Sequence, residues 1–197
     1  DKVFNRGFGR PLPSWFANNA MYPEAAQQGQ TRCDLELAGR LLDEAGWRLN
    51  SSGTREKDGR PLEFTLLTWG TEKAAGPVLQ AQWGKVGVKV KVQHSDDYAM
   101  IEAKRKEGDW DAFIEAWSVF GNPLALFRSH LASGGDINYV DFQDEKINQV
   151  IEAMARTVDP EQLKKLVLEG NQRASETLPF IPLVPRLLVS SAREDIT

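Results

Sequence analysis

The stretch LEFTLLTWGTEKAAGPVLQAQWGKVGVKVKV, residues 62–92, contains the clearest secondary-structure pattern of the chain. Apolar and polar residues alternate from Leu62 in a segment that runs on to Trp69, and they alternate again over residues 88–92. This alternation is typical of strands with one buried face. Between these segments, over 72–85, apolar residues recur at helical spacing, and Gly87 ends the pattern. A strand, a helix and a second strand in this order are typical of a right-handed crossover between parallel strands. The stretch therefore predicts an α/β fold.

The residues on either side extend the same architecture. Residues 34–47 show the apolar spacing of an amphipathic helix, and Asp58-Gly59 predicts a tight turn in a hairpin. Residues 96–106 predict a charged surface helix, on which Lys104-Arg105-Lys106 is expected to form a solvated face. Residues 111–117 predict a buried strand, which would complete a second crossover.

The last part of the chain predicts helices. Residues 124–131 predict a short helix, and residues 145–155 a longer one with an apolar face. Asp159-Pro160 predicts the start of another, because a capping residue precedes a proline at the first helical position. The prolines of residues 180–185 exclude a central strand, so this segment is expected to be an edge strand or a linker.

Composition limits the classes of function. Of 197 residues, 41% are hydrophobic, and 28 Asp and Glu against 24 Lys and Arg give a net charge of −4. This mildly acidic balance gives no electrostatic reason to expect nucleic acid or an anionic membrane as a partner. The one cysteine, Cys33, cannot form an internal disulfide, and no apolar run approaches the roughly 20 residues that cross a bilayer.

Motifs of catalysis are absent from the sequence. It contains no G-x-S-x-G, no G-x-x-x-x-G-K-[ST], no H-E-x-x-H, and no G-x-G-x-x-G after a predicted strand. Of the two histidines, His94 is expected to be solvated, and His130 is interpreted as a helix-surface or capping residue rather than a metal ligand. We therefore expect no enzyme, no cofactor and no metal site.

Aromatic residues and small or polar residues gather in three loops that are expected to follow strands. These loops are residues 68–70, 117–123 and 134–139. In an open α/β sheet, ligands bind outside the carboxyl ends of the strands, which favours a binding site formed by the first two loops. The alternative is that Trp69 and Trp117 only pack against the protein, as large aromatic residues often do.

Six sequence motifs, in order, resemble those of one family, the peptide/nickel class of ABC-transporter extracytoplasmic solute-binding proteins (solute-binding protein family 5). The motifs are DLELAGRLLDEAGW (34–47), KDGRPL (57–62), LQAQWGKVGVKV (79–90), GDWDAFIEAW (108–117) with Asn122-Pro123, NYVDFQDEKIN (138–148) and LPFIPL (178–183). The resemblance spans residues 7–185.

This resemblance implies a type II periplasmic-binding fold of two lobes, with the ligand held between them by hinge closure. Residues 1–197 look like a single C-terminal ligand-binding lobe. Residues 1–30 would be a loop-rich lead-in from the hinge, 31–178 the α/β body, and 179–197 an exit strand towards the hinge. The implied partners are the N-terminal lobe of the same protein, the ABC permease transmembrane subunits and a small solute.

The resemblance also implies a location and a site. Such a protein would be exported, periplasmic or extracellular and membrane-anchored, with its signal peptide absent from this sequence. Matched position by position, the motifs place the ligand-facing side chains at Trp117, Phe120 and Asn122, with Trp69, Asn138 and Tyr139 as further candidates.

One position departs from the family pattern. Peptide-binding members tend to carry an Asp three residues after the tryptophan, where it pairs with the α-amino group of the peptide, and this chain has Phe120. The solute is therefore left open between a peptide, a metal chelate and an opine-like compound. Two other classes also stay open: an interaction module that contacts the permease or unfolded chains, and, more remotely, a hydrolase.

Overall fold

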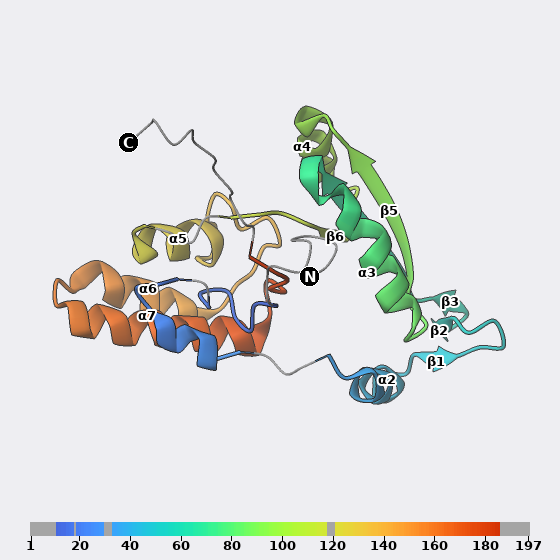
Figure 1. Cartoon of the computed structure of the whole chain (residues 1–197), viewed down its shortest axis with the longest axis horizontal. Helices are drawn as coiled ribbons and strands as arrows, with labels where there is room; N and C mark the ends of the chain where they lie inside the picture. The colour runs from blue at the N-terminus through green and yellow to red at the C-terminus, as the bar shows by residue number, and fades with distance from the viewer. Residues whose placement is uncertain (1–10, 18, 30–32, 118–120, 186–197) are drawn as a thin grey trace, which may run out of the picture. The chain divides into compact units, whose positions relative to one another are not determined.

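The computed structural model describes residues 11–17, 19–29, 33–117 and 121–185. Contacts divide the chain into two compact units: unit 1 combines residues 1–30 with 118–197, and unit 2 is residues 31–117. Each unit has its own helices, and strands lie in unit 2 (Figure 1). The prediction of a single lobe over residues 1–197 stays a prediction.

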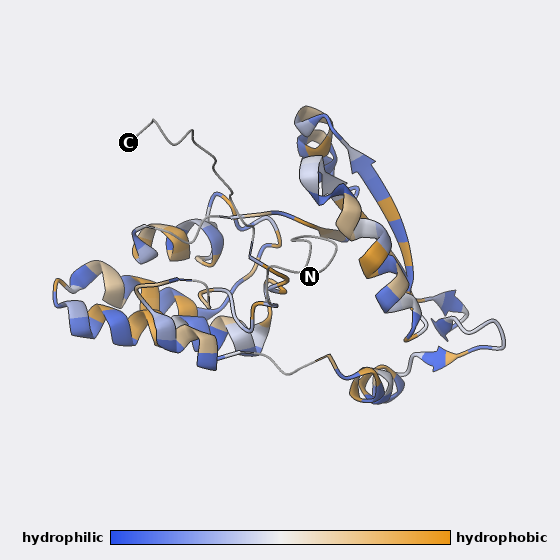
Figure 2. Ribbon diagram, viewed as in Figure 1, coloured by the Kyte–Doolittle hydropathy of each residue, from blue (hydrophilic) through white to orange (hydrophobic). Residues whose placement is uncertain are grey.

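Unit 2 contains a parallel three-stranded sheet in the order β5-β4-β6. The strands are β4 (Glu63–Trp69), β5 (Lys89–Ser95) and β6 (Ala112–Phe113). β4 pairs with β5 along its whole length and with β6 over a short segment, in parallel in both cases. Hydrophobic and hydrophilic residues alternate over the first four residues of β5, and its last three residues are polar (Figure 2). The parallel crossover predicted from residues 62–92 is confirmed.

The strand predicted over 111–117 is shorter than expected. Only Ala112 and Phe113 pair with β4, opposite Leu66 and Leu67. Residues 114–117 have no strand structure, and Ala116 and Trp117 are exposed. The predicted length was wrong because the apolar character of these two residues does not reflect burial in the sheet.

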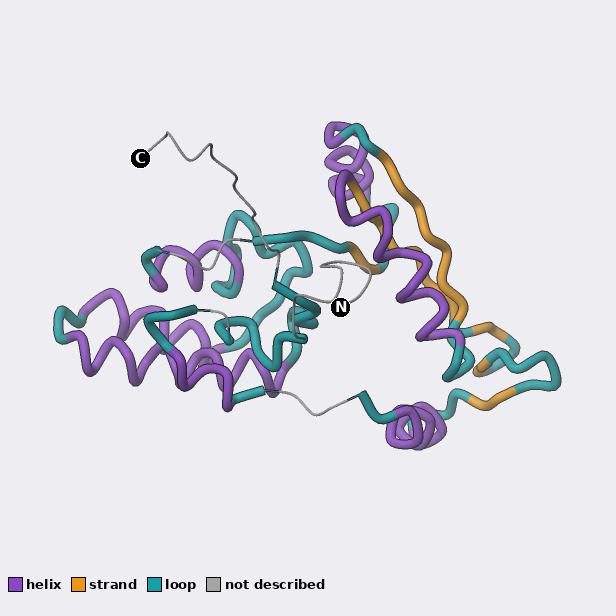
Figure 3. The backbone as a smooth tube through the Cα atoms, in the orientation of Figure 1, coloured by secondary structure: helices purple, strands orange, loops and turns teal. Residues whose placement is uncertain are grey.

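Two helices connect the parallel strands (Figure 3). A 3-10 turn, η2 (Gly70–Ala74), leads into α3 (Ala75–Gly84), and α4 (Tyr98–Glu107) lies between β5 and β6 in the chain. α4 begins at the N-cap Asp97 and ends at Gly108, whose φ of 75° is left-handed and therefore suits glycine. Both helices agree with the predicted ranges.

The remaining elements of unit 2 are a helix and a small antiparallel sheet. They are α2 (Leu35–Glu44), β1 (Arg48–Leu49), β2 (Arg55–Lys57) and β3 (Arg60–Pro61). Asp58 and Gly59 have φ values of 53° and 75°, as a two-residue hairpin turn of this hand requires. The helix and the hairpin turn predicted here are confirmed.

Unit 1 is built from helices and loops. Its elements are η1 (Pro23–Gln27), α5 (Pro123–His130), α6 (Glu145–Arg156) and α7 (Pro160–Thr177). Asn122, Asp144 and Asp159 cap α5, α6 and α7, each accepting a hydrogen bond from a backbone N–H of the first turn. All three helices begin within a few residues of the predicted positions.

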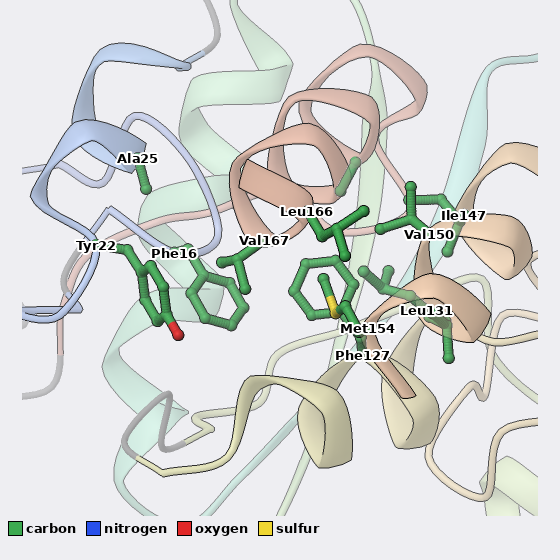
Figure 4. Close-up of a cluster of buried hydrophobic side chains, with 12 residues drawn as sticks. Phe16, Tyr22, Ala25, Phe127, Leu131, Ile147, Val150, Met154, Leu166 and Val167 are labelled. Atoms are coloured by element: carbon green, nitrogen blue, oxygen red, sulfur yellow. The ribbon is translucent and has the colours of Figure 1, made fainter. Parts of the chain in front are cut away.

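The core of unit 1 lies between these helices and the N-terminal loop (Figure 4). Its buried residues are Phe16, Tyr22, Ala25, Phe127, Leu131, Ile147, Val150, Ile151, Met154, Leu166, Val167 and Ala174. Asn171 of α7 ties the loop to this core: its Oδ1 accepts from Phe16 N at 3.1 Å, and its Nδ2 donates to Ser14 Oγ at 3.1 Å. Residues 180–185 form no strand, and Leu12 N donates to Leu183 O at 3.0 Å, so the segment is a linker that packs on the loop.

Candidate ligand-binding site

In an open α/β sheet, ligands bind at the carboxyl edge of the parallel strands. β4 ends there at Trp69, and Glu115 and Trp117 follow the end of β6. The strands are parallel, so their carboxyl ends meet at one edge of the sheet. The sequence analysis expected the loops that begin near Trp69 and Trp117 to lie at this edge; Trp69 ends β4, and Trp117 lies four residues beyond the end of β6.

Trp69 packs against an aromatic neighbour at this edge. Its ring centroid lies 4.8 Å from that of Tyr98, with 59° between the ring planes. The indole Nε1 is buried and has no hydrogen-bond partner among the residues that the structure describes. Tyr98 remains 40% exposed, so the pair presents an aromatic surface to the solvent.

The other predicted site residues occupy different places. Trp117 exposes 38% of its surface at the end of unit 2. Phe120 lies outside the described residues. Asn122 belongs to unit 1, where its Oδ1 accepts a hydrogen bond from Leu124 N at 2.9 Å and caps α5.

Asn138 uses its whole side-chain amide inside unit 1. Its Nδ2 donates to Ala132 O at 2.9 Å and to Phe142 O at 2.7 Å, and its Oδ1 accepts from Phe142 N at 2.9 Å. These bonds hold the loop between α5 and α6 in shape. Tyr139, the next residue, is half-buried. Asn138 therefore positions the backbone around Tyr139, a structural task that its sequence context did not reveal.

Sequence reasoning missed a group of charged residues at the edge of the sheet. This edge cluster consists of Glu72 on η2, Glu102 and Arg105 on α4, and Glu115 after β6. Arg105 forms an ion pair with Glu102, and its Nη1 lies 3.9 Å from Glu115 Oε2. The side chain of Arg105 is only 4% exposed, so the prediction of a solvated Lys104-Arg105-Lys106 face was wrong for its middle member.

A helical signal for the burial of Arg105 was present in the sequence. Ile101 is buried, and Arg105 follows it by one turn on the same face of α4. The guanidinium carbon of Arg105 lies 5.3 Å from the ring centroid of Phe113 and 6.0 Å from that of Tyr98. The aromatic faces of β6 and α4 therefore enclose this cation.

Glu115 titrates at an unusual pH for a carboxyl group. Burial raises its pKa to about 7, the nearby Arg105 lowers it, and the charges of Glu102 and Glu72 raise it. The Glu115 side chain is 10% exposed. Its charge therefore changes near neutral pH, and it responds to any further charge placed beside it.

The sheet edge also carries an arrangement that resembles a catalytic relay. Thr68 Oγ1 lies 3.0 Å from His94 Nδ1, and His94 Nε2 lies 3.1 Å from Asp96 Oδ1. Thr68, however, has no exposed surface, so its hydroxyl cannot reach a substrate. The His94 side chain is 17% exposed, against the expectation of a solvated histidine.

His130 is much more buried than the sequence led us to expect. It is 2% exposed, and its ring lies 5.4 Å from that of Trp15 in the core region of unit 1. The prediction of a helix-surface or capping residue was wrong, because α5 turns this position towards the N-terminal loop. Within the described ranges, no group of three or more His, Cys, Asp or Glu residues could hold a metal ion.

Comparison with known proteins identifies the family. Residues 1–139 match the model of the bacterial extracellular solute-binding proteins, family 5, middle region. The chain belongs to this family. The family 5 match contains the parallel sheet, the edge cluster and the candidates Trp69 and Trp117.

Individual relatives agree with the family assignment. Over 160 residues, the family 5 chain is 31% identical to the oligopeptide-binding protein OppA of Lactococcus lactis subsp. lactis, covering 74% of this chain and 26% of OppA. It is 30% identical to protein XP55 of Streptomyces lividans over 81% of this chain and 30% of that protein. The chain thus spans between a quarter and a third of the length of these relatives.

Solved structures show the same fold. NikA from Brucella suis, solved with Fe(III)-EDTA, is 29% identical with a TM-score of 0.76, over 92% of this chain and 38% of NikA. AppA from Bacillus subtilis, solved with a nonapeptide, is 24% identical with a TM-score of 0.70, over 93% of this chain and 38% of AppA. The family 5 chain therefore has the α/β fold of the type II periplasmic binding proteins and covers part of it.

Proposed function

We propose that this chain is part of an extracytoplasmic solute-binding protein that captures a small solute for an ABC importer and performs no catalysis. The observation that carries the proposal is the family 5 match over residues 1–139. The sheet edge supports it, because aromatic surface and buried charge gather where α/β proteins bind ligands. The buried hydroxyl of Thr68 argues against a hydrolase.

In this proposal residues 1–197 form the C-terminal lobe, and the solute is held between it and an N-terminal lobe that closes about a hinge. Solute contacts would come from Trp117, Phe120 and Asn122, with Trp69, Asn138 and Tyr139 as further contributors. Exposed aromatic surface at Trp117 supports a stacking role. Asn138 would act by shaping its loop, since its amide is already fully bonded.

The loaded protein would dock on the transmembrane subunits of the permease. It would work outside the cytoplasm, in the periplasm or anchored at the extracellular face of a membrane. The family description as extracellular proteins supports this location. Among the described residues, no helix is both long and apolar enough to span a bilayer.

The candidate solutes are a peptide, a metal chelate and an opine-like compound. OppA and AppA are relatives named or solved as peptide binders, and Brucella NikA was solved with a metal chelate. The test is native mass spectrometry of the full-length protein purified from its own host. A retained small solute of any of these classes supports solute capture, and a protein that binds no small molecule in this experiment or in subsequent calorimetry contradicts it.

A second candidate is an interaction module whose aromatic residues serve packing. The contact between Trp69 and Tyr98 favours that role for Trp69. Trp117→Ala and Phe120→Ala in the full-length protein separate the two candidates. Loss of solute uptake with an unchanged melting temperature supports solute capture, whereas loss of folding supports packing.

A further inference from the structure

Two segments that lie far apart in the sequence meet in unit 1. They are the lead-in segment, residues 11–17, and the exit segment, residues 178–185, which begins at the C-cap of α7. Leu12 N of the first donates to Leu183 O of the second at 3.0 Å. The chain therefore first enters and finally leaves the helical part of unit 1 at one place.

A pocket lies between these two segments and the end of α7. The ring centroids of Trp15 and Phe180, which both line it, are 5.9 Å apart. Ile181, the residue after Phe180, exposes 67% of its surface. Three of the lining residues are prolines, which carry no N–H donor, so the pocket suits an apolar side chain. The residues that line this proline pocket include Pro13, Trp15, Leu178, Pro179, Phe180 and Pro182.

Leu178 adopts a backbone conformation that is unfavourable for leucine. It has φ 52° and ψ 49°, in the left-handed region that favours glycine at helix ends. The other described non-glycine residues with a positive φ are Asp58 and Asp141, and aspartate tolerates this region better. Leu178 nevertheless remains 43% exposed, so the described residues bury only part of its side chain. A strained leucine that stays exposed at the rim of a pocket indicates a further contact of that side chain.

The position of the proline pocket favours one occupant. This chain spans 26% of OppA and 38% of NikA, and in the proposed function the lead-in and exit segments connect it to an N-terminal lobe. A lobe tethered through two segments that border the pocket is held there at a high effective concentration. A second copy of the protein or an unconnected partner has no such advantage.

We propose that the proline pocket is the docking site for an apolar side chain of the N-terminal lobe, which packs against Trp15, Leu178 and Phe180. This inference rests on the two-lobe arrangement in the proposed function and adds an interaction surface to it. The contact holds the lead-in and exit segments against unit 1, so the hinge motion takes place in the residues beyond Leu12 and Leu183.

The experiment places the photo-cross-linker p-benzoylphenylalanine at position 181 of the full-length protein. Ile181 is exposed, so the replacement should leave unit 1 folded. After irradiation, mass spectrometry of a protease digest identifies the cross-linked peptides. We expect the main cross-link to join position 181 to a peptide of the N-terminal lobe of the same molecule.

Val158 is the matched control position. It is fully exposed and lies just before α7, whereas Ile181 lies just after that helix. The 18 residues of α7 separate the two ends of the helix by about 27 Å. The cross-linker at position 158 should therefore give no cross-link to the N-terminal lobe above background.

Two variants of Leu178 test the pocket itself. Leu178→Asp places a charge at the proposed apolar contact and should lower the cross-link yield from position 181 about tenfold. Aspartate tolerates the left-handed conformation, so this variant should keep the end of α7 intact. Leu178→Met keeps an apolar side chain and should retain most of the yield. The melting temperature of each variant distinguishes loss of the contact from a change of fold.

The outcomes separate this inference from solute capture. Cross-links from position 181 only to residues 1–197, only to a second molecule, or to nothing would overturn the docking site, as would an unchanged yield in Leu178→Asp. Solute retained by the same protein in native mass spectrometry would then leave solute capture standing. Conversely, a cross-link to the N-terminal lobe in a protein that binds no solute would support the docking site and contradict solute capture.

Discussion

Arg55 is a buried cation that holds together four segments of unit 2. Its Nε donates to Val86 O at 2.8 Å, and its Nη1 donates to Trp47 O at 2.6 Å and to Asp43 Oδ1 at 2.7 Å. Its Nη2 donates to Gly39 O at 3.2 Å. Two of the acceptors, Val86 O and Trp47 O, lie just after α3 and just before β1, and Gly39 O lies within α2, so Arg55 links β2 to all three.

Arg55→Met is therefore expected to lower the free energy of unfolding by about 3 kcal/mol or more, since it removes hydrogen bonds to a charged donor and leaves acceptors unpaired. The measurement is urea unfolding, followed by hydrogen exchange of the amides of unit 2. Arg48→Met is the matched control: Arg48 contacts the same Asp43 at 3.5 Å but is 70% exposed. Arg48→Met should change the free energy of unfolding by no more than about 0.5 kcal/mol. If both variants lower the free energy of unfolding equally, the proposed role of Arg55 is contradicted.

His130 gives unit 1 a pH dependence. Burial lowers the pKa of its imidazole below the ordinary value of 6.5, while a backbone hydrogen bond with Leu126 and the charge of Asp136 raise it. Protonation on acidification therefore favours the unfolded chain, in which the imidazole is solvated.

We expect the contribution of His130 to the free energy of unfolding to be fully present above pH 6.5. This contribution should fall as the pH drops through 6.5 towards the lower pKa of the folded state. His130→Gln should flatten this decline in urea unfolding measured at several pH values. Glu115 is present in both proteins, so the difference between their pH profiles reports His130 alone. The raised pKa of Glu115 makes the folded state bind a proton more readily than the unfolded chain, so its contribution to stability increases as the pH falls. Parallel pH profiles for the two proteins would refute the prediction.

Among the elements, α7 shows how a glycine sets the distance between helices. Gly170 of α7 faces Phe127 of α5, and a Cβ at position 170 would overlap the phenylalanine ring. Phe127 is fully buried in the core of unit 1, so it has little room to move.

Gly170→Ala should accordingly destabilise the chain by about 1–3 kcal/mol, although alanine is the better helix former. Gly84→Ala in α3 is the matched control, because a Cβ there meets no atom within 4 Å. It should be neutral or stabilise by up to about 0.5 kcal/mol. Thermal unfolding compares the two, and a gain of stability in Gly170→Ala would show that the helices can separate at no cost.

Most elements could be predicted from the sequence, because their signals are local. Asp34, Asp97 and Asp159 cap helices at or next to the predicted starts, and Asp58-Gly59 makes the predicted turn. The exception, β6, depends on pairing with β4, which lies far away in the sequence. The length of a strand depends on how many residues of the neighbouring strand are available for pairing, as well as on its own residues.

At the scale of the whole molecule, the proposed two-lobe site predicts that this chain alone binds its solute weakly. It would supply only part of the contacts and could not close over the ligand. Isothermal titration calorimetry with the solute retained by the full-length protein should give at least about a hundredfold weaker binding for residues 1–197, the equivalent of a few lost contacts. Equal affinity of the two proteins would contradict a site shared between lobes.

The candidate site was only partly predictable. Trp69 was expected at the carboxyl end of a strand, and it is the last residue of β4. Trp117 was expected at the end of a strand over 111–117, but that strand ends four residues earlier, at Phe113. Glu115 was not recognised because it looked like part of a strand, and Arg105 was read as part of a basic helix face although its spacing from Ile101 was a signal of burial. Asn138 was predicted as a ligand contact, and its bonds show a loop-shaping role that depends on residues 132 and 142.

Residue spacing and motif order were enough to predict the helices, the parallel crossover and the family. Tertiary packing set the burial of His130, the bonds of Arg55 to segments on other elements, and the position of Arg105 between two aromatic rings and 3.9 Å from Glu115. Helices and turns depend on residues that are close together in the sequence. The burial and pairing of a charge depend on which distant segments of the chain pack around it.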